Sequence, residues 1–106
     1  MTEVKPEILE RIRKGETALF REIVDTYRNM ALSLTLKILK NREEAEDALQ
    51  ESFIKLFRAL VSNGFESRAK FSTYFYTIVY NTAVDYYRKY YSRAFNVTSV
   101  VIYRLS

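Results

Sequence analysis

Residues 41–60, NREEAEDALQESFIKLFRAL, carry the clearest structural signal in the chain. Apolar or small residues recur in this stretch at steps of three and four, which is the spacing of one face of an α-helix. Asn41 precedes the pattern and Glu44 follows three residues later, an arrangement that resembles a capping box. The stretch therefore predicts a helix that starts after Asn41 and ends at the turn signal Ser62-Asn63-Gly64.

Three further helices are predicted on either side of this stretch. Residues 16–39 and residues 71–92 each carry an apolar stripe at helical spacing. A short charged helix is expected at residues 7–14, because Pro6 suits a first helical turn and Gly15 suits the left-handed residue after the last turn. The predicted fold is all-α, a small bundle of three long helices plus a short N-terminal helix.

The chain of 106 residues is long enough for one domain, which we assign to residues 1–95. Residues 96–106 change in character and are rich in β-branched side chains. We interpret them as a linker or tail, and an edge strand is equally compatible with their composition.

The composition excludes several classes of chemistry. The chain contains no Cys and no His, so thiol nucleophiles, imidazole bases and zinc sites of the usual kinds are ruled out. We therefore expect a protein that is not an enzyme and that needs no metal or cofactor. The sequence also has no run of 18 apolar residues and no apolar segment near its charged N-terminus, so we expect a cytoplasmic protein without a membrane span.

Charge and aromatic residues are distributed unevenly. Residues 41–66 contain 3 basic and 6 acidic side chains, whereas residues 67–106 contain 6 basic and 1 acidic. Ten of the 16 aromatic residues lie between Phe71 and Phe95, more than one helical face can bury. Cations and exposed rings together suit a single-stranded nucleic acid, and tyrosines that fill an amphipathic helix are an equally good explanation.

One face of the helix at residues 41–60 is acidic and carries an amide. Asp47, Gln50, Glu51 and Ile54 share this face because they lie three, four and seven residues apart. Such a face can dock a basic partner helix. An acidic first turn that complements the helix dipole explains the earlier glutamates but does not reach these positions.

The helix that starts at Phe71 leaves a polar and aromatic face outside its apolar stripe. Asn has a low propensity for helix interiors, so its presence at position 81 indicates that the amide has a function, such as a hydrogen bond to a base edge. A cationic helix end that complements the dipole is the alternative for the basic residues. The outward residues are Tyr76, Thr77, Tyr80, Asn81, Asp85, Arg88 and Lys89.

The loop at residues 62–70 precedes that helix. It presents Phe65, Arg68 and Lys70, which together suit an unstacked base. A surface loop that only connects two helices is the simpler interpretation.

Three blocks of sequence occur in an order and at separations that resemble region two of the extracytoplasmic-function sigma factors. They are ETALFREIVDTY at residues 16–27, NREEAEDALQESF at residues 41–53 and KFSTYFYTIVYNTAVDYYR at residues 70–88. The resemblance covers residues 7–93. It implies an all-helical domain that docks on the clamp coiled coil of the β′ subunit of bacterial RNA polymerase and captures the nontemplate strand of the minus-ten promoter element.

The resemblance also implies roles for individual residues. Asp47, Gln50 and Glu51 match the residues that contact the polymerase, with Phe53, Ile54 and Phe57 in or near that surface. The residues implied in DNA binding are Phe71 and Asn81 at the pocket for a flipped base, Phe65, Arg68 and Lys70 in the specificity loop, Tyr74 where the family usually has Trp, and Arg88, Lys89 and Arg93 at duplex phosphates. The tyrosines between Tyr86 and Tyr91 depart from the family pattern, so packing, DNA contact and partner binding all stay open for them.

The family carries a second domain, region four, which this sequence does not include. We expect the 106 residues to be part of a longer protein, and a natural region-two domain on its own is the alternative. Two other functions are compatible with the residues: a helical protein-interaction module without a DNA role, and a nonspecific single-strand binder. An anti-sigma partner would fit the same surfaces.

Overall fold

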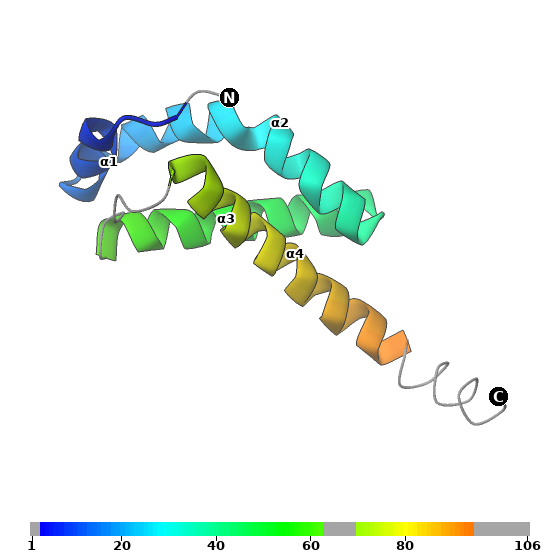
Figure 1. The fold of residues 1–106 in the computed structure, drawn as a ribbon. Helices are drawn as coiled ribbons and strands as arrows, with labels where there is room; N and C mark the ends of the chain where they lie inside the picture. Colours follow the sequence, from blue (N-terminus) through cyan, green and yellow to red (C-terminus); the bar gives the residue numbers. More distant parts are fainter. Residues whose placement is uncertain (1–2, 63–69, 95–106) are drawn as a thin grey trace, which may run out of the picture.

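The computed structural model describes residues 3–62 and 70–94, with side chains described as far as Lys89. The regular elements in this part are all helical (Figure 1), which confirms the predicted all-α fold. Their bounds are Pro6–Arg13 for α1, Thr17–Leu19 for the short 3-10 helix η1, Phe20–Leu39 for α2, Arg42–Ser62 for α3 and Phe71–Ala94 for α4. Phe65, Arg68 and the tail at residues 96–106 lie outside the described residues.

The three long helices pack against one another around a shared core. Helices α2 and α3 run in opposite directions and are joined by a short connection, and α4 crosses this pair (Figure 1). Helix α4 has 24 residues, so it is about 36 Å long. Its C-terminal end projects beyond the α2–α3 pair (Figure 1).

The start of α3 shows one of the two hydrogen bonds of the predicted capping box: Asn41 caps the helix, whereas Oε2 of Glu44 is buried without a hydrogen-bond partner among the described residues. The backbone N–H of Glu44 donates a hydrogen bond of 3.0 Å to Oδ1 of Asn41. Just before it, Lys40 adopts the left-handed conformation with φ 56°, and its N–H bonds to the carbonyl of Leu36. The reversal of the chain between α2 and α3 is thus completed within two residues.

The N-terminal part differs from the prediction in one detail. Residues 16–39 do not form one continuous helix, because η1 precedes α2. Gly15 has φ 116°, and the N–H groups of Gly15 and Glu16 bond to the carbonyls of Ile12 and Arg11. This pattern is a Schellman motif, which ends α1 and redirects the chain before α2 can begin.

The core is built on aromatic rings from three helices. Tyr27 and Phe75 are fully buried, with ring centroids 5.8 Å apart. Two more rings complete the cluster. The ring centroid of Phe53 on α3 lies 4.9 Å from that of Phe75, and the centroid of Phe71 on α4 lies 5.6 Å from that of Tyr27. A second, smaller cluster of Leu39, Ala48 and Ala83, with Ile38 and Tyr86 packed on it, closes the other end of the bundle.

Candidate functional site

An exposed stripe runs along α3 on the side away from the core. Asp47, Gln50 and Ile54 all lie on it, as their spacing predicted. Ile54 is 44% exposed, an unusual position for a large aliphatic side chain in the middle of a helix. Carboxylate, amide and aliphatic groups side by side can bind a partner helix that offers both cations and apolar side chains.

An apolar hollow opens beside this stripe, between α2 and α3. Its volume is about 390 Å³. Phe20 of α2 lines this hollow. Its ring centroid lies 5.1 Å from the ring centroid of Phe57 and 6.4 Å from that of Phe53. Phe53 is only 8% exposed, so it forms the floor. The residues that line the hollow are Phe20, Gln50, Phe53, Ile54, Phe57 and Arg58.

A second hollow of about 380 Å³ continues the first toward the start of α3. The two share Gln50 and Phe53, so together they form one groove between the helices. Helix α2 contributes Val24 and Arg28 to this part, and α3 contributes Glu46 and Leu49. The α2 side of the groove was not predicted from the sequence, because Phe20 belongs to the apolar stripe of residues 16–39 and such a stripe predicts only packing against the core.

Glu51 lies one turn after Asp47 and has partners on α4. The hydroxyl of Tyr86 on α4 donates a hydrogen bond of 3.4 Å to Oε1 of Glu51, and Nζ of Lys55 lies 3.4 Å from Oε2. Lys55 also donates to the hydroxyl of Thr82 on α4, at 3.1 Å. Both oxygens of this carboxylate therefore have partners within the domain, at the boundary between α3 and α4.

The surroundings of Tyr86 raise the pKa of its phenol. Burial raises the pKa of the Tyr86 phenol above its ordinary value, and the negative charges of Glu51 and Asp47 raise it further, as does the hydrogen bond to Glu51. The hydroxyl therefore stays protonated and acts as a donor. Among the alternatives for the tyrosines from Tyr86 onward, the structure favours packing for Tyr86 itself.

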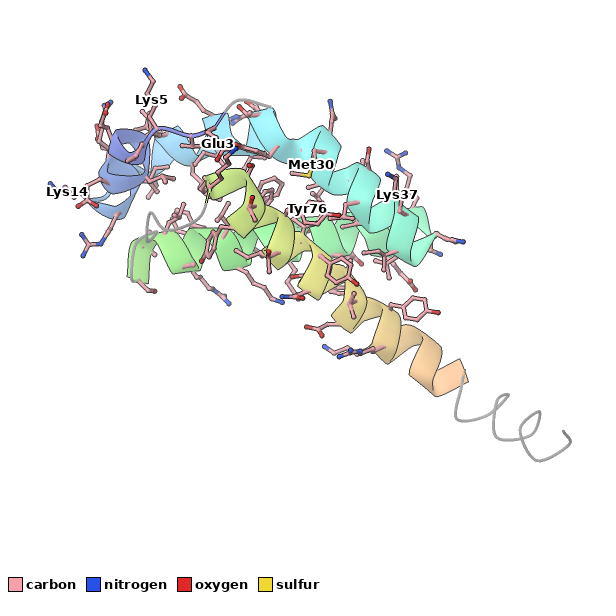
Figure 2. The ribbon with its side chains drawn as sticks, in the orientation of Figure 1. Glu3, Lys5, Lys14, Met30, Lys37 and Tyr76 are labelled. Carbon is pink, nitrogen blue, oxygen red and sulfur yellow. The ribbon has the colours of Figure 1, made fainter. Side chains whose placement is uncertain are left out.

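The outer face of α4 carries two parallel rows of side chains. The tyrosine row consists of Tyr76, Tyr80 and Tyr87, which are 48%, 48% and 45% exposed. The polar row consists of Thr77, Asn81 and Arg88, all exposed. Members of each row lie four and seven residues apart, so they align along the helix. Figure 2 shows Tyr76 on the side of α4 that faces α2.

The remaining predicted DNA residues fall into three groups. Lys70, directly before α4, and Lys89, near its other end, are both exposed. Tyr74 is half-buried. Phe71 is 2% exposed and packs against Tyr27 and Phe75, so it supports the surface from beneath. Arg93 belongs to α4, but its side chain lies outside the described part.

The described residues contain no cluster of three or more acidic side chains that could hold a metal ion. None of the helices in the same part is both long and apolar enough to cross a membrane.

Comparison with known families identifies the class of this domain. The family described as Sigma-70 region 2 matches residues 23–93, which is most of the chain. The chain therefore belongs to the Sigma-70 region 2 family.

Individual relatives lie within the same class. The ECF RNA polymerase sigma factor SigW of Bacillus subtilis is 37% identical over 81 residues, which make up 76% of this chain and 42% of the relative. The ECF RNA polymerase sigma-E factor of Escherichia coli K12 is 35% identical over 79 residues, 74% of this chain and 40% of the relative. The chain thus spans about two fifths of the length of these relatives.

A solved structure is similar over nearly the whole chain. It is the NMR structure of an engineered region 2 of sigmaE in complex with GTAAAA. It matches with a TM-score of 0.71 and 32% identity, over 92% of this chain and 99% of the other. The likeness extends through all four helices and confirms the bundle as a region-two fold.

Proposed function

We propose that this domain serves in transcription initiation: it docks on bacterial core RNA polymerase and holds the unpaired nontemplate strand of a minus-ten promoter element. The observation that carries the proposal is the likeness, over 92% of the chain, to a region 2 whose solved structure contains GTAAAA. The chain also presents two separate exposed surfaces, one on α3 and one on α4, as a domain that joins a protein to a nucleic acid requires.

The α3 surface suits the clamp coiled coil of the β′ subunit. Asp47 and Gln50 supply an acceptor and an amide for cationic side chains, and the adjoining groove accepts aliphatic ones. Ile54 lies between these two features and becomes buried when a helix is seated there. Glu51 borders this surface and pairs with Lys55 and Tyr86 at the boundary between α3 and α4.

The α4 surface suits an unpaired strand. Stacking of a base on an aromatic side chain contributes about 1–3 kcal/mol, which offsets the few kcal/mol needed to unpair and flip a base. The tyrosine row offers such rings, and Asn81 in the polar row offers a donor and an acceptor to a base edge. Lys70, Arg88 and Lys89 supply cations for phosphates. Phe65, Arg68 and Arg93 are further candidates for this role on the basis of the sequence.

Docking is tested by charge reversal on the exposed stripe. Asp47→Lys is expected to abolish capture of core polymerase by the domain, because a cation at this point repels a basic partner. Glu7→Lys is the matched control, since Glu7 is an exposed acid on α1, a helix that does not line the groove. Both variants should keep a helical circular dichroism spectrum. Undiminished capture by Asp47→Lys contradicts the docking surface.

Strand capture is tested with oligonucleotides. The domain is expected to bind the nontemplate minus-ten strand more tightly than its complement, and Asn81→Ala should remove part of this preference. Asn29→Ala is the control, because Asn29 is exposed on α2. Equal binding of both strands supports a nonspecific binder, and polymerase capture without any strand binding supports a protein-interaction module. An anti-sigma partner should block both activities, because it would cover the same surfaces.

A further inference from the structure

The N-terminal arm, residues 3–5, contacts the start of α4. Oε1 of Glu3 accepts a hydrogen bond of 3.0 Å from the backbone N–H of Ser72, across 69 positions of sequence. Figure 2 shows the Glu3 side chain beside the beginning of α4. Hydrogen bonds from Ser72 lower the pKa of the Glu3 carboxyl below its ordinary value, and the charge of Lys70 and the N–H of Phe71 add to this effect. Glu3 is therefore ionised at neutral pH.

The contact with Glu3 supplies the start of α4 with an acceptor from outside the helix. The first N–H groups of any helix have no partner within the helix and need an acceptor from elsewhere. Lys70 directly precedes α4, and its side chain has no acceptor atom. The first turn of α4 contains no acidic residue. A carboxylate from the arm thus does what an N-cap residue does in most helices, and its charge also complements the helix dipole.

The arm is fixed in place by its own packing. Val4 is partly buried and packs against the aromatic core. A hollow of about 340 Å³ separates the arm from α2, and Ile23 and Thr26 form its α2 side. Glu3 lies close enough to Tyr27 for its charge to help raise the pKa of that phenol, after burial. Tyr27 in turn packs on Phe71, the first residue of α4. Glu3 therefore lies near both Tyr27 of α2 and the first turn of α4.

This point is next to the residues that we assign to strand capture. Lys70 precedes Ser72 by two positions, and Tyr74 follows it by two. The N–H of Tyr74 bonds to the carbonyl of Lys70 at 3.0 Å, so the two residues share the first turn of α4. If the start of α4 frays, this turn loses its helical structure, and the side chains of Lys70 and Tyr74 no longer keep a fixed orientation.

We propose that Glu3 is a positioning residue for strand capture, which caps α4 from the N-terminal arm and holds Lys70 and Tyr74 in the orientation that the unpaired strand requires. The inference rests on the proposed function, and it assigns to the segment before α1 a part in nucleic-acid recognition. Glu3 itself does not touch the strand; it acts through the first turn of α4.

The test compares three variants of the full chain. Glu3→Ala removes the acceptor, Glu3→Gln keeps an acceptor but removes the charge, and Glu7→Ala is the control on α1. We expect Glu3→Ala to weaken binding of the nontemplate minus-ten oligonucleotide by up to about tenfold, which is the loss if the whole stability cost of one helix cap is transferred to binding. Glu3→Gln should fall between Glu3→Ala and the unaltered chain. Capture of core polymerase should stay unchanged, because α3 is not involved.

Amide hydrogen exchange gives an independent readout. Exchange at Ser72 and Thr73 should accelerate in Glu3→Ala, whereas exchange at Phe53 in α3 should not. Strand binding by Glu3→Ala equal to that of Glu7→Ala overturns the inference, and so does a parallel loss of polymerase capture, which would indicate general destabilisation. If the unaltered chain shows no preference for the nontemplate strand, the proposed function itself fails, a result distinct from either of these.

Discussion

The hydroxyl of Tyr86 on α4 bonds to the carboxylate of Glu51 on α3, with 3.4 Å between the two oxygens. This contact ties the helix proposed to dock on the polymerase to the second half of the helix proposed to hold DNA. The carboxylate also pairs with Lys55 in the same helix, at 3.4 Å. Glu51 is thus a structural residue of the α3–α4 boundary, while Asp47 and Gln50 remain fully available on the exposed stripe.

Tyr86→Phe isolates this contact because it keeps the ring against Ala48 and Ala83 and removes only the donor. The bond is long and partly exposed, so we expect the free energy of unfolding to fall by about 0.5–1 kcal/mol. Urea denaturation measures this change. Tyr80→Phe, at a position of α4 where the ring is 48% exposed, should leave stability unaltered. A loss above about 2 kcal/mol would mean that the hydroxyl has a larger structural role than its hydrogen bond accounts for.

Asn41→Ala tests the cap of α3. The side chain of Asn41 satisfies the N–H of Glu44 at 3.0 Å, and Ala cannot replace it. The expected cost is about 1 kcal/mol of unfolding free energy, as for other N-cap residues. Asn41→Asp keeps an acceptor at the same position and should retain most of the stability. Similar losses in both variants would contradict the capping role.

Lys40→Gly should stabilise the domain. Lys40 has φ 56°, a conformation in which a side chain is strained by about 1 kcal/mol and Gly is not. Greater freedom of Gly in the unfolded chain offsets part of the gain, so we expect a net increase of about 0.5 kcal/mol. Lys37→Gly, one turn earlier in α2, should instead destabilise by about 0.5–1 kcal/mol. Thermal unfolding of the two variants should therefore shift in opposite directions.

The fold was predictable from the sequence because its signals are local. Asn41 and Glu44 mark the start of α3 through a cap that spans three residues, and the structure contains this bond. Gly15 marks the end of α1 through its left-handed conformation. Apolar spacing predicted a buried stripe on residues 71–92, and Phe75 and Val79 within this range are fully buried. Each of these signals depends on neighbours within a few positions.

The contacts that define the candidate site were less predictable, because they join distant positions. No periodicity relates Glu3 to Ser72, and the capping bond follows only from the path of the arm across α4. Phe20 fitted the apolar stripe of its helix, yet it lines the groove beside α3. Helical spacing also grouped Glu51 with Asp47, but it gave no indication of the hydrogen bond that Tyr86 of α4 donates to Glu51.

Tyr80 tests the tyrosine row. Tyr80→Ala removes an exposed ring and should weaken binding of a single strand by about fivefold or more, in keeping with about 1–3 kcal/mol per stacked base. Tyr80→Phe keeps the ring and should bind like the unaltered chain. Because stacking is tolerant of sequence, the loss should be equal for the nontemplate strand and for its complement. Quenching of 2-aminopurine placed along the oligonucleotide measures stacking directly. Equal losses in the Ala and Phe variants would point to the hydroxyl instead of the ring.

Stability should fall at alkaline pH because of Tyr86 and Tyr27. Burial raises the pKa of both phenols in the folded domain, and nearby carboxylates add to this. In the unfolded chain a tyrosine ionises near pH 10, so above this value the unfolded state binds fewer protons than the folded state. The free energy of unfolding should therefore be insensitive to these groups below about pH 9 and decrease above about pH 10. Tyr86→Phe should make the decrease shallower, as measured by urea denaturation at a series of pH values, and an unchanged slope would show that the folded domain does not shift the ionisation of Tyr86.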